Sequence, residues 1–260
     1  MRVEPIACLS DNYAYLIVDE KKQQVVVVDA SEPAPVLAAI ARVGLPLAAI
    51  LSTHHHGDHV GGNEDVIAAH PKAEVIGHRS DEQRIPKVTR LVDDGESFTL
   101  GSLRVVAHHV PGHTLGAVTY VVRDGDGPAY AFTGDTLFLA GCGRLFEGTA
   151  EQMHRSLNHV LANLHGETRV ACGHEYTASN LRFAQHVEPS NAAIQKLAQE
   201  VDRRRAAGEP TVPGTIAGEL ATNPFMRVES PAVRAHVGLG DNADPVEVLA
   251  RLRKEKDGFK

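Results

Sequence analysis

Short runs of β-branched and apolar residues fill much of the first fifty positions and predict strands. The stretch at residues 34–44, APVLAAIARVG, instead has helical spacing and ends in a glycine, which favours a helix that stops there. A further apolar run, residues 47–53, predicts a buried strand. The first thirty residues contain three such runs, RVEPIACL, AYLIVDE and QQVVVVDA. Three short strands in succession are typical of a meander at the edge of a sheet.

After a short predicted helix at residues 61–70, the sequence again shows patterns typical of strands. The next strands are expected at residues 73–78, 97–110, 117–124 and 129–135. Residues 148–165 predict a helix, because Thr149 and Gln152 have the spacing of a capping box. One more strand and turn, ETRVACGHEY, ends this part of the chain.

From about residue 177 the pattern becomes helical. Residues 180–210 predict two helices that are broken at Glu188–Pro189, and the Pro/Gly-rich residues 209–226 predict an extended linker. The last helix is expected to begin at Asp244, as N-cap, with Pro245 in its first turn. We therefore expect an α/β domain at residues 1–175 and a smaller helical domain at residues 176–260.

The composition narrows the class of protein. The 260 residues are 43% hydrophobic with a net charge of −7, which argues against a general nucleic-acid-binding face. No apolar stretch approaches the roughly 18 residues of a membrane helix, and the beginning of the chain lacks the pattern of a secretory signal. Three cysteines suit a reducing compartment. We expect a soluble, cytoplasmic protein that binds neither nucleic acid nor membrane.

The stretch THHHGDHVGG, residues 53–62, concentrates side chains that can bind metals. In an extended segment His54 and His56 point the same way, so both imidazoles can reach one metal ion. Gly57 permits a sharp turn, after which Asp58 and His59 can be aimed at a second position. Because this stretch follows a buried strand, it lies where α/β folds place their sites.

Three more candidate ligands stand on loops that follow predicted strands: His113, Asp135 and His174. Imidazole and carboxylate groups suit zinc, iron or manganese, and the absence of a CxxC motif argues against a structural thiolate site. A single catalytic zinc takes three protein ligands, so the candidates exceed one site. Spacing assigns the ligands of the first cluster, but it leaves the grouping of these three open.

These motifs, in this order, resemble the signature of the metallo-β-lactamase superfamily. Within that superfamily the chain looks like a glyoxalase II, or hydroxyacylglutathione hydrolase, over nearly its whole length. The motifs that carry this closer resemblance are GDTLF (134–138), GCGRLFEGTAEQM (141–153), CGHEYT (172–177), NPFMR (223–227) and RKEKDGFK (253–260).

The resemblance implies an αββα sandwich with two divalent metal ions, zinc first and iron or manganese as alternatives. It implies a first metal site of His54, His56 and His113, a second of Asp58, His59 and His174, and Asp135 as the bridging ligand. The implied reaction is hydrolysis of the thioester S-D-lactoylglutathione to glutathione and D-lactate, the second step of methylglyoxal detoxification. A metal-bridging hydroxide would attack the thioester, with Asp58 as the catalytic residue that orients it.

The family also implies a set of glutathione-binding residues, and the chain departs from the family pattern at two of them. Arg144 stands where the family often has lysine, which keeps the charge but changes its geometry. Phe146 stands where the family often has tyrosine, so it offers a ring without a hydroxyl. On the predicted last helix, Arg253 and Lys256 share a face. The full set is Arg144, Phe146, Tyr176, Arg253 and Lys256.

Three alternative functions remain open at this point. One is another hydrolase of the same fold that acts on a lactone or β-lactam, and another is a glutathione persulfide dioxygenase with a single iron. The third is a non-catalytic protein that binds metal or glutathione. The helical C-terminal part and its basic end favour the thioesterase, which we expect to be a monomer.

Overall fold

The computed structural model describes residues 1–259, and its contacts divide the chain into two units. Unit 1 consists of Met1–His109, Gly116–Gly134 and Ala171–His174. Unit 2 consists of Val110–Leu115, Asp135–Val170 and the chain from Glu175 onward. The chain therefore passes between the units several times, and residues that are distant in sequence meet within each unit.

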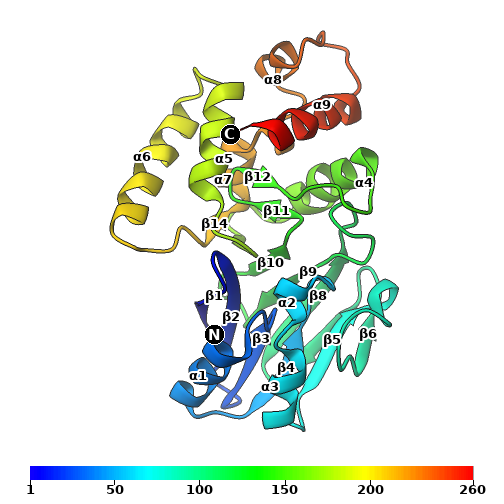
Figure 1. Cartoon of the computed structure of the whole chain (residues 1–260), viewed down its shortest axis with the longest axis vertical. Coiled ribbons are helices and arrows are strands. Elements are labelled where there is room, and N and C mark those ends of the chain that lie inside the picture. Colours follow the sequence, from blue (N-terminus) through cyan, green and yellow to red (C-terminus); the bar gives the residue numbers. More distant parts are fainter. Residues whose placement is uncertain (260) are drawn as a thin grey trace. The chain divides into compact units, whose positions relative to one another are not determined.

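Unit 1 contains a six-stranded sheet with the order β1-β2-β3-β4-β5-β6 (Figure 1). The first three strands pair antiparallel and the remaining neighbours pair parallel. This confirms the predicted meander at the edge of a sheet. The strands are β1 (Arg2–Cys8), β2 (Asn12–Asp19), β3 (Gln24–Val28), β4 (Leu47–Leu51), β5 (Glu74–His78) and β6 (Arg90–Val92).

Helices connect the parallel strands of this sheet, and α1 and α3 cover one of its faces (Figure 1). In α1, Val36 and Ile40 belong to a core cluster with Leu16 and Val27 of the sheet. All eight residues of β2 are buried, so the sheet is covered on both faces. The helices are α1 (Pro33–Val43), α2 (Gly57–Val60), α3 (Asn63–Ala69) and the 3₁₀ turn η1 (Arg79–Asp81).

A second set of strands in unit 1 packs against the first sheet. Its order is β10-β9-β8-β7, with the end of β13 next to β10. Tyr15 of β2 contacts Phe132 of β10 edge to face, and the Tyr120 hydroxyl donates to Ser52 O and Ile76 O. These strands are β7 (Ser97–Leu100), β8 (Leu103–His109), β9 (Val118–Arg123), β10 (Tyr130–Gly134) and β13 (Arg169–Cys172).

Unit 2 is mainly helical (Figure 1). The predicted caps are confirmed: Thr149 and Gln152 form a capping box, and Asp244 accepts from Val246 N at the beginning of α9. Its helices are α4 (Ala150–His154), the π-helix η2 (Arg155–Val160), the 3₁₀ turn η3 (Leu161–Asn163), α5 (Thr177–Val187), α6 (Ala192–Ala206), α7 (Ile216–Thr222), the 3₁₀ turn η4 (Pro224–Met226), α8 (Pro231–His236) and α9 (Pro245–Gly258).

Short strands complete unit 2. β11 (Leu137–Phe138) pairs with β12 (Gly141–Cys142), and the beginning of β13 pairs with β14 (Gly214–Thr215). Helices α5 and α6 share a small core that contains Leu181 and Ile194. Between residues 1 and 259, no helix combines the length and hydropathy that crossing a membrane requires.

The prediction of an extended linker at residues 209–226 is wrong. The segment forms β14, α7 and η4. Thr215 caps α7 because its hydroxyl accepts from Gly218 N, and Ile216 is fully buried. The Pro/Gly-rich composition therefore gave no indication that Thr215 caps a helix or that Ile216 packs in the interior.

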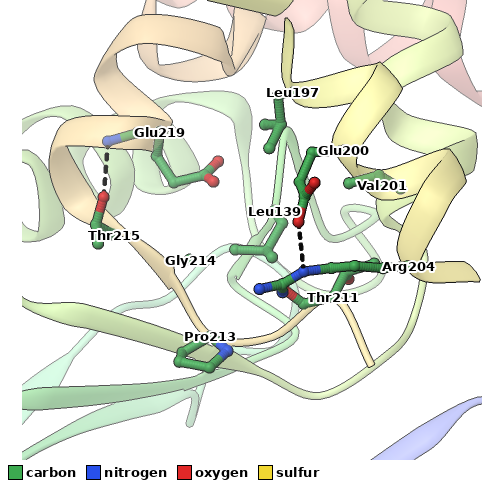
Figure 2. A pocket seen from close by; sticks show the side chains of 11 residues that line it. Leu139, Leu197, Glu200, Val201, Arg204, Thr211, Pro213, Gly214, Thr215 and Glu219 are labelled. Atoms are coloured by element: carbon green, nitrogen blue, oxygen red, sulfur yellow. Dashed lines mark hydrogen bonds and ion pairs between the residues drawn. The ribbon is translucent and has the colours of Figure 1, made fainter. Parts of the chain in front are cut away.

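Glu219 of α7 is a buried carboxylic acid. Its Oε2 accepts from Ala140 N and from Asn223 Nδ2. Burial raises the pKa of Glu219 to about 7. The side chain also lines a pocket of about 230 Å³, together with Leu139 and Leu197 (Figure 2). The described lining of this pocket includes none of the predicted metal or substrate ligands.

We expect Glu219 to make stability fall as pH rises. The unfolded chain loses this proton near 4.5 and the folded chain only at about 7, so the stabilisation is complete below 4.5 and is lost through 7. The change is up to about 3 kcal/mol. Urea unfolding from pH 4.5 to 8 should show that Glu219→Gln removes this dependence. A constant difference between variant and parent across that range would contradict the argument.

Candidate metal centre

Two residues separate the His54–His59 stretch from the buried strand that precedes it. β4 is followed by Ser52 and Thr53, both buried, and α2 then begins at Gly57. His59 is fully buried, with Nδ1 beside the Asp29 carboxylate, whereas Asp58 is partly exposed. The rigid strand therefore fixes where the histidine stretch begins, and the turn at α2 carries its second half.

The first two ligand candidates lie together. His54 Nε2 is 3.2 Å from His56 Nδ1, and the ring of His54 is 4.2 Å from that of His59 between centroids. His55 instead places Nδ1 3.1 Å from Asp81 Oδ2. This is the alternation expected of an extended segment.

Asp58, His59 and His174 form a second group within unit 1. One donor atom from each lies within 4.8 Å of the others. Asp58 Oδ2 is 3.4 Å from His174 Nε2 and 3.8 Å from His59 Nε2. Two imidazoles and a carboxylate converging in this way form a donor set suited to a divalent transition ion.

Carboxylates hold the other nitrogen of these histidines. His59 Nδ1 donates to Asp29 Oδ2 at 2.9 Å, and His174 Nδ1 donates to Asp11 Oδ1 at 2.8 Å. A proton fixed on Nδ1 leaves the Nε2 lone pair available for a metal ion. Asn12 Nδ2 donates to Asp58 Oδ2 at 3.1 Å, which orients the remaining ligand.

Sequence reasoning missed Asp29, Asp11 and Asn12. Asp29 follows the buried run VVVV at the end of β3, and its carboxylate also accepts from Thr53 N and Thr53 Oγ1. Its backbone has φ +54°, in the left-handed region that aspartate tolerates better than most residues. The sequence feature that could have identified Asp29 is its position as a polar residue directly after a buried strand.

Unit 2 holds His113 and Asp135. His113 Nε2 is 3.5 Å from Asp135 Oδ2, and His113 Nδ1 donates to Arg144 O at 2.9 Å. This ring therefore has the same tautomer as His59 and His174. Gly143 allows the backbone to pass close to Asp135, because a Cβ at this position would lie 2.0 Å from Asp135 O.

The residues predicted to bind glutathione all belong to unit 2. Phe146 is exposed, and its ring lies 5.2 Å from that of His113. Tyr176 packs edge-on against Phe138. Arg144 is exposed, with Nε 3.8 Å from Asp257 Oδ1.

The two basic residues of α9 differ in exposure. Arg253 is only 5% exposed, and it donates from Nη1 to Cys142 O at 2.7 Å. Lys256 is half-buried and donates from Nζ to Ser179 O at 3.3 Å. Burial, together with the nearby Arg253, Arg182 and Arg144, lowers the pKa of Lys256 to about 8. Lys256 is therefore the more accessible of the two cations.

Comparison with known proteins gives two family matches. Residues 10–174 match the model of the metallo-β-lactamase superfamily, and residues 175–259 match the model described as the hydroxyacylglutathione hydrolase C-terminus. The His/Asp donor sets and this fold are compatible with a dinuclear metal site.

Curated relatives match over the full length. The cytoplasmic hydroxyacylglutathione hydrolase of Arabidopsis thaliana is 43% identical, with 100% of both chains covered. The hydroxyacylglutathione hydrolase of Brucella anthropi is 46% identical, with 100% of this chain and 97% of the relative covered. Among solved structures, ETHE1 from Myxococcus xanthus has a TM-score of 0.67 at 25% identity, with 100% of both chains covered.

We expect Asp29→Asn to lower metal affinity about 10–100-fold, because an amide no longer holds His59 in one tautomer. The measurement is zinc competition with a chromogenic chelator. Asp19→Asn is the matched control, since Asp19 is also buried in unit 1 but accepts from Ser102 N and Ser102 Oγ. Parental zinc affinity in the Asp29 variant would show that the contact does not support the ligand.

Proposed function

Because the chain belongs to the hydroxyacylglutathione hydrolase family of the metallo-β-lactamase superfamily, we propose that it hydrolyses S-D-lactoylglutathione to glutathione and D-lactate. The observation that carries this proposal is the C-terminal match, residues 175–259, combined with 43–46% identity over the full length. The superfamily match alone would be consistent with several hydrolases.

The proposed metal ligands are the seven residues named from the sequence. Support for them comes from their donor chemistry and from the carboxylates and carbonyl that orient three of the imidazoles. When bound, two divalent ions, zinc first, would lower the pKa of water and polarise a carbonyl oxygen. The proposed ligands are His54, His56, His113, Asp58, His59, His174 and Asp135.

Asp58 is the proposed catalytic residue. It is partly exposed, and Asn12 Nδ2 donates to its Oδ2, so the carboxylate has a fixed direction and can still meet solvent. In this position it would accept a hydrogen bond from the attacking water and orient it. The departing glutathione thiolate has an intrinsic pKa of about 8.5, so it leaves without a strong general acid.

Cations of unit 2 are proposed to bind the carboxylates of glutathione. Lys256 has its pKa lowered by burial and by neighbouring arginines, including Arg144 and Arg182. Asp257 balances part of this charge, since its Oδ1 lies 3.1 Å from Arg253 Nη2 and 3.8 Å from Arg144 Nε, and the positive charge that remains favours a ligand with two carboxylates. Arg253 is buried and donates to Cys142 O, and it would add positive charge behind the exposed cations.

The C-terminal match and the 43–46% identity to hydroxyacylglutathione hydrolases favour the thioesterase over the three alternatives, and the structural neighbour ETHE1 is only 25% identical. We propose that the enzyme acts as a monomer in the cytoplasm. The cytoplasmic relative from Arabidopsis thaliana supports that location.

We expect Asp135→Ala to lose both metal ions and thioester hydrolysis together, because a bridging carboxylate serves two sites. Metal content by mass spectrometry and the absorbance of S-D-lactoylglutathione measure the two effects separately. In the parent enzyme we expect two ions per chain at this dinuclear centre and no oxygen consumption. A single iron with oxygen uptake would instead identify a persulfide dioxygenase.

Lys256 should make KM depend on pH. Below its pKa of about 8 the side chain is charged and binds a carboxylate, and above it the charge is lost, so KM should rise while kcat changes little. We expect the KM of the Lys256→Arg variant to stay constant through this pH range. The Lys256→Ala variant should have a roughly tenfold higher KM at every pH. The same rise in the alanine variant would assign the titration to another group.

A further inference from the structure

Three helices of unit 2 bring metal-binding side chains to one point outside the proposed centre. His186 lies in the last turn of α5, His236 is the last residue of α8, and Glu255 lies in α9. α5 packs against α8, and Glu255 of α9 contacts a histidine from each of these helices (Figure 1). Each side chain thus comes from a different element, and their convergence is a property of the tertiary fold.

The two histidines direct the same ring atom at one carboxylate. His186 Nε2 is 3.0 Å from Glu255 Oε1, and His236 Nε2 is 3.1 Å from both Oε1 and Oε2 of Glu255. The rings of the histidines are nearly perpendicular, with centroids 4.9 Å apart. One donor atom from each residue lies within 4.8 Å of the others.

These separations are close to those of a tetrahedral zinc site. Ligand atoms about 2.0–2.2 Å from zinc are roughly 3.4 Å apart. The nitrogen–oxygen distances at Glu255 are shorter by a few tenths of an ångström, so small side-chain rotations would admit an ion. Without an ion, the protons on the two Nε2 atoms occupy that space and donate to Glu255.

The position of the cluster allows an ion to enter and leave. The His236 side chain is 18% exposed, Glu255 35% and His186 49%. Partial exposure leaves one side for water, which completes the four-coordinate geometry. Two imidazoles and one carboxylate select zinc or a similar divalent transition ion over magnesium or calcium, which prefer sets made of oxygen atoms.

We propose that His186, His236 and Glu255 form an additional site for a divalent transition ion, with zinc as the first candidate. The ion would replace two hydrogen bonds by three coordinate bonds and link α5, α8 and α9. Glu255 lies next to Lys256 on α9, so this link would also limit movement of the helix that carries that cation.

Equilibrium dialysis of the full chain against buffered zinc, with metal counted by mass spectrometry, tests the site. We expect His186→Gln, His236→Gln and Glu255→Gln each to bind one zinc ion fewer per chain than the parent. Zinc should also raise the Tm of the parent more than that of the variants. The comparison uses differences between chains, so its outcome is independent of the ions in the proposed dinuclear centre and of thioester hydrolysis.

His165→Gln is the control, because it removes an exposed imidazole elsewhere in unit 2. It should keep the parental zinc content. If it loses an ion as the three variants do, binding is unspecific and the proposal is overturned. Equal zinc content in the parent and in all three variants overturns it as well. His186→Gln changes a half-exposed side chain at a helix end, so we expect this variant to disturb folding least.

Discussion

The proposed chemistry depends on keeping imidazole rings in one tautomer. Asp29, Asp11 and the carbonyl of Arg144 each accept the Nδ1 proton of a histidine, at 2.9, 2.8 and 2.9 Å. Only this arrangement leaves Nε2 free of a proton, and only an unprotonated nitrogen can bind a metal ion. The acceptors are of different kinds, two carboxylates and one backbone carbonyl, yet they impose the same state on rings in both units.

Buried strands supply the precision that this constraint requires. Asp29 follows β3, the histidine stretch follows β4, and Asp135 follows β10, while His174 follows β13. The ends of these strands are held by long-range hydrogen bonds, such as the donation from Thr53 N to Asp29 Oδ1 at 2.8 Å. Polar groups at the ends of stiff, buried strands can therefore be oriented without a flexible loop having to be ordered upon binding.

Local patterns predicted much of the fold. The edge meander, the capping box at Thr149 and the cap at Asp244 are confirmed, as are the family and the class of fold. The linker at 209–226 is wrong, because burial of Ile216 outweighs local composition. The domain boundary after residue 175 and the roles of the individual site residues stay predictions. Asp29 was missed because its contact with His59 joins residues thirty positions apart, which only the tertiary fold brings together.

The last helix illustrates how one element can serve several contacts. Successive residues of a helix point about 100° apart, so Glu255 and Lys256 face different surroundings. Glu255 meets His186 and His236, whereas Lys256 lies over the ring of Phe183 and donates to Ser179 O. α5 supplies partners to both, since His186 and Ser179 belong to it. Any rotation of α9 relative to α5 must therefore disturb both contacts together, so the orientation of the Lys256 cation and the geometry at Glu255 are set by the same packing.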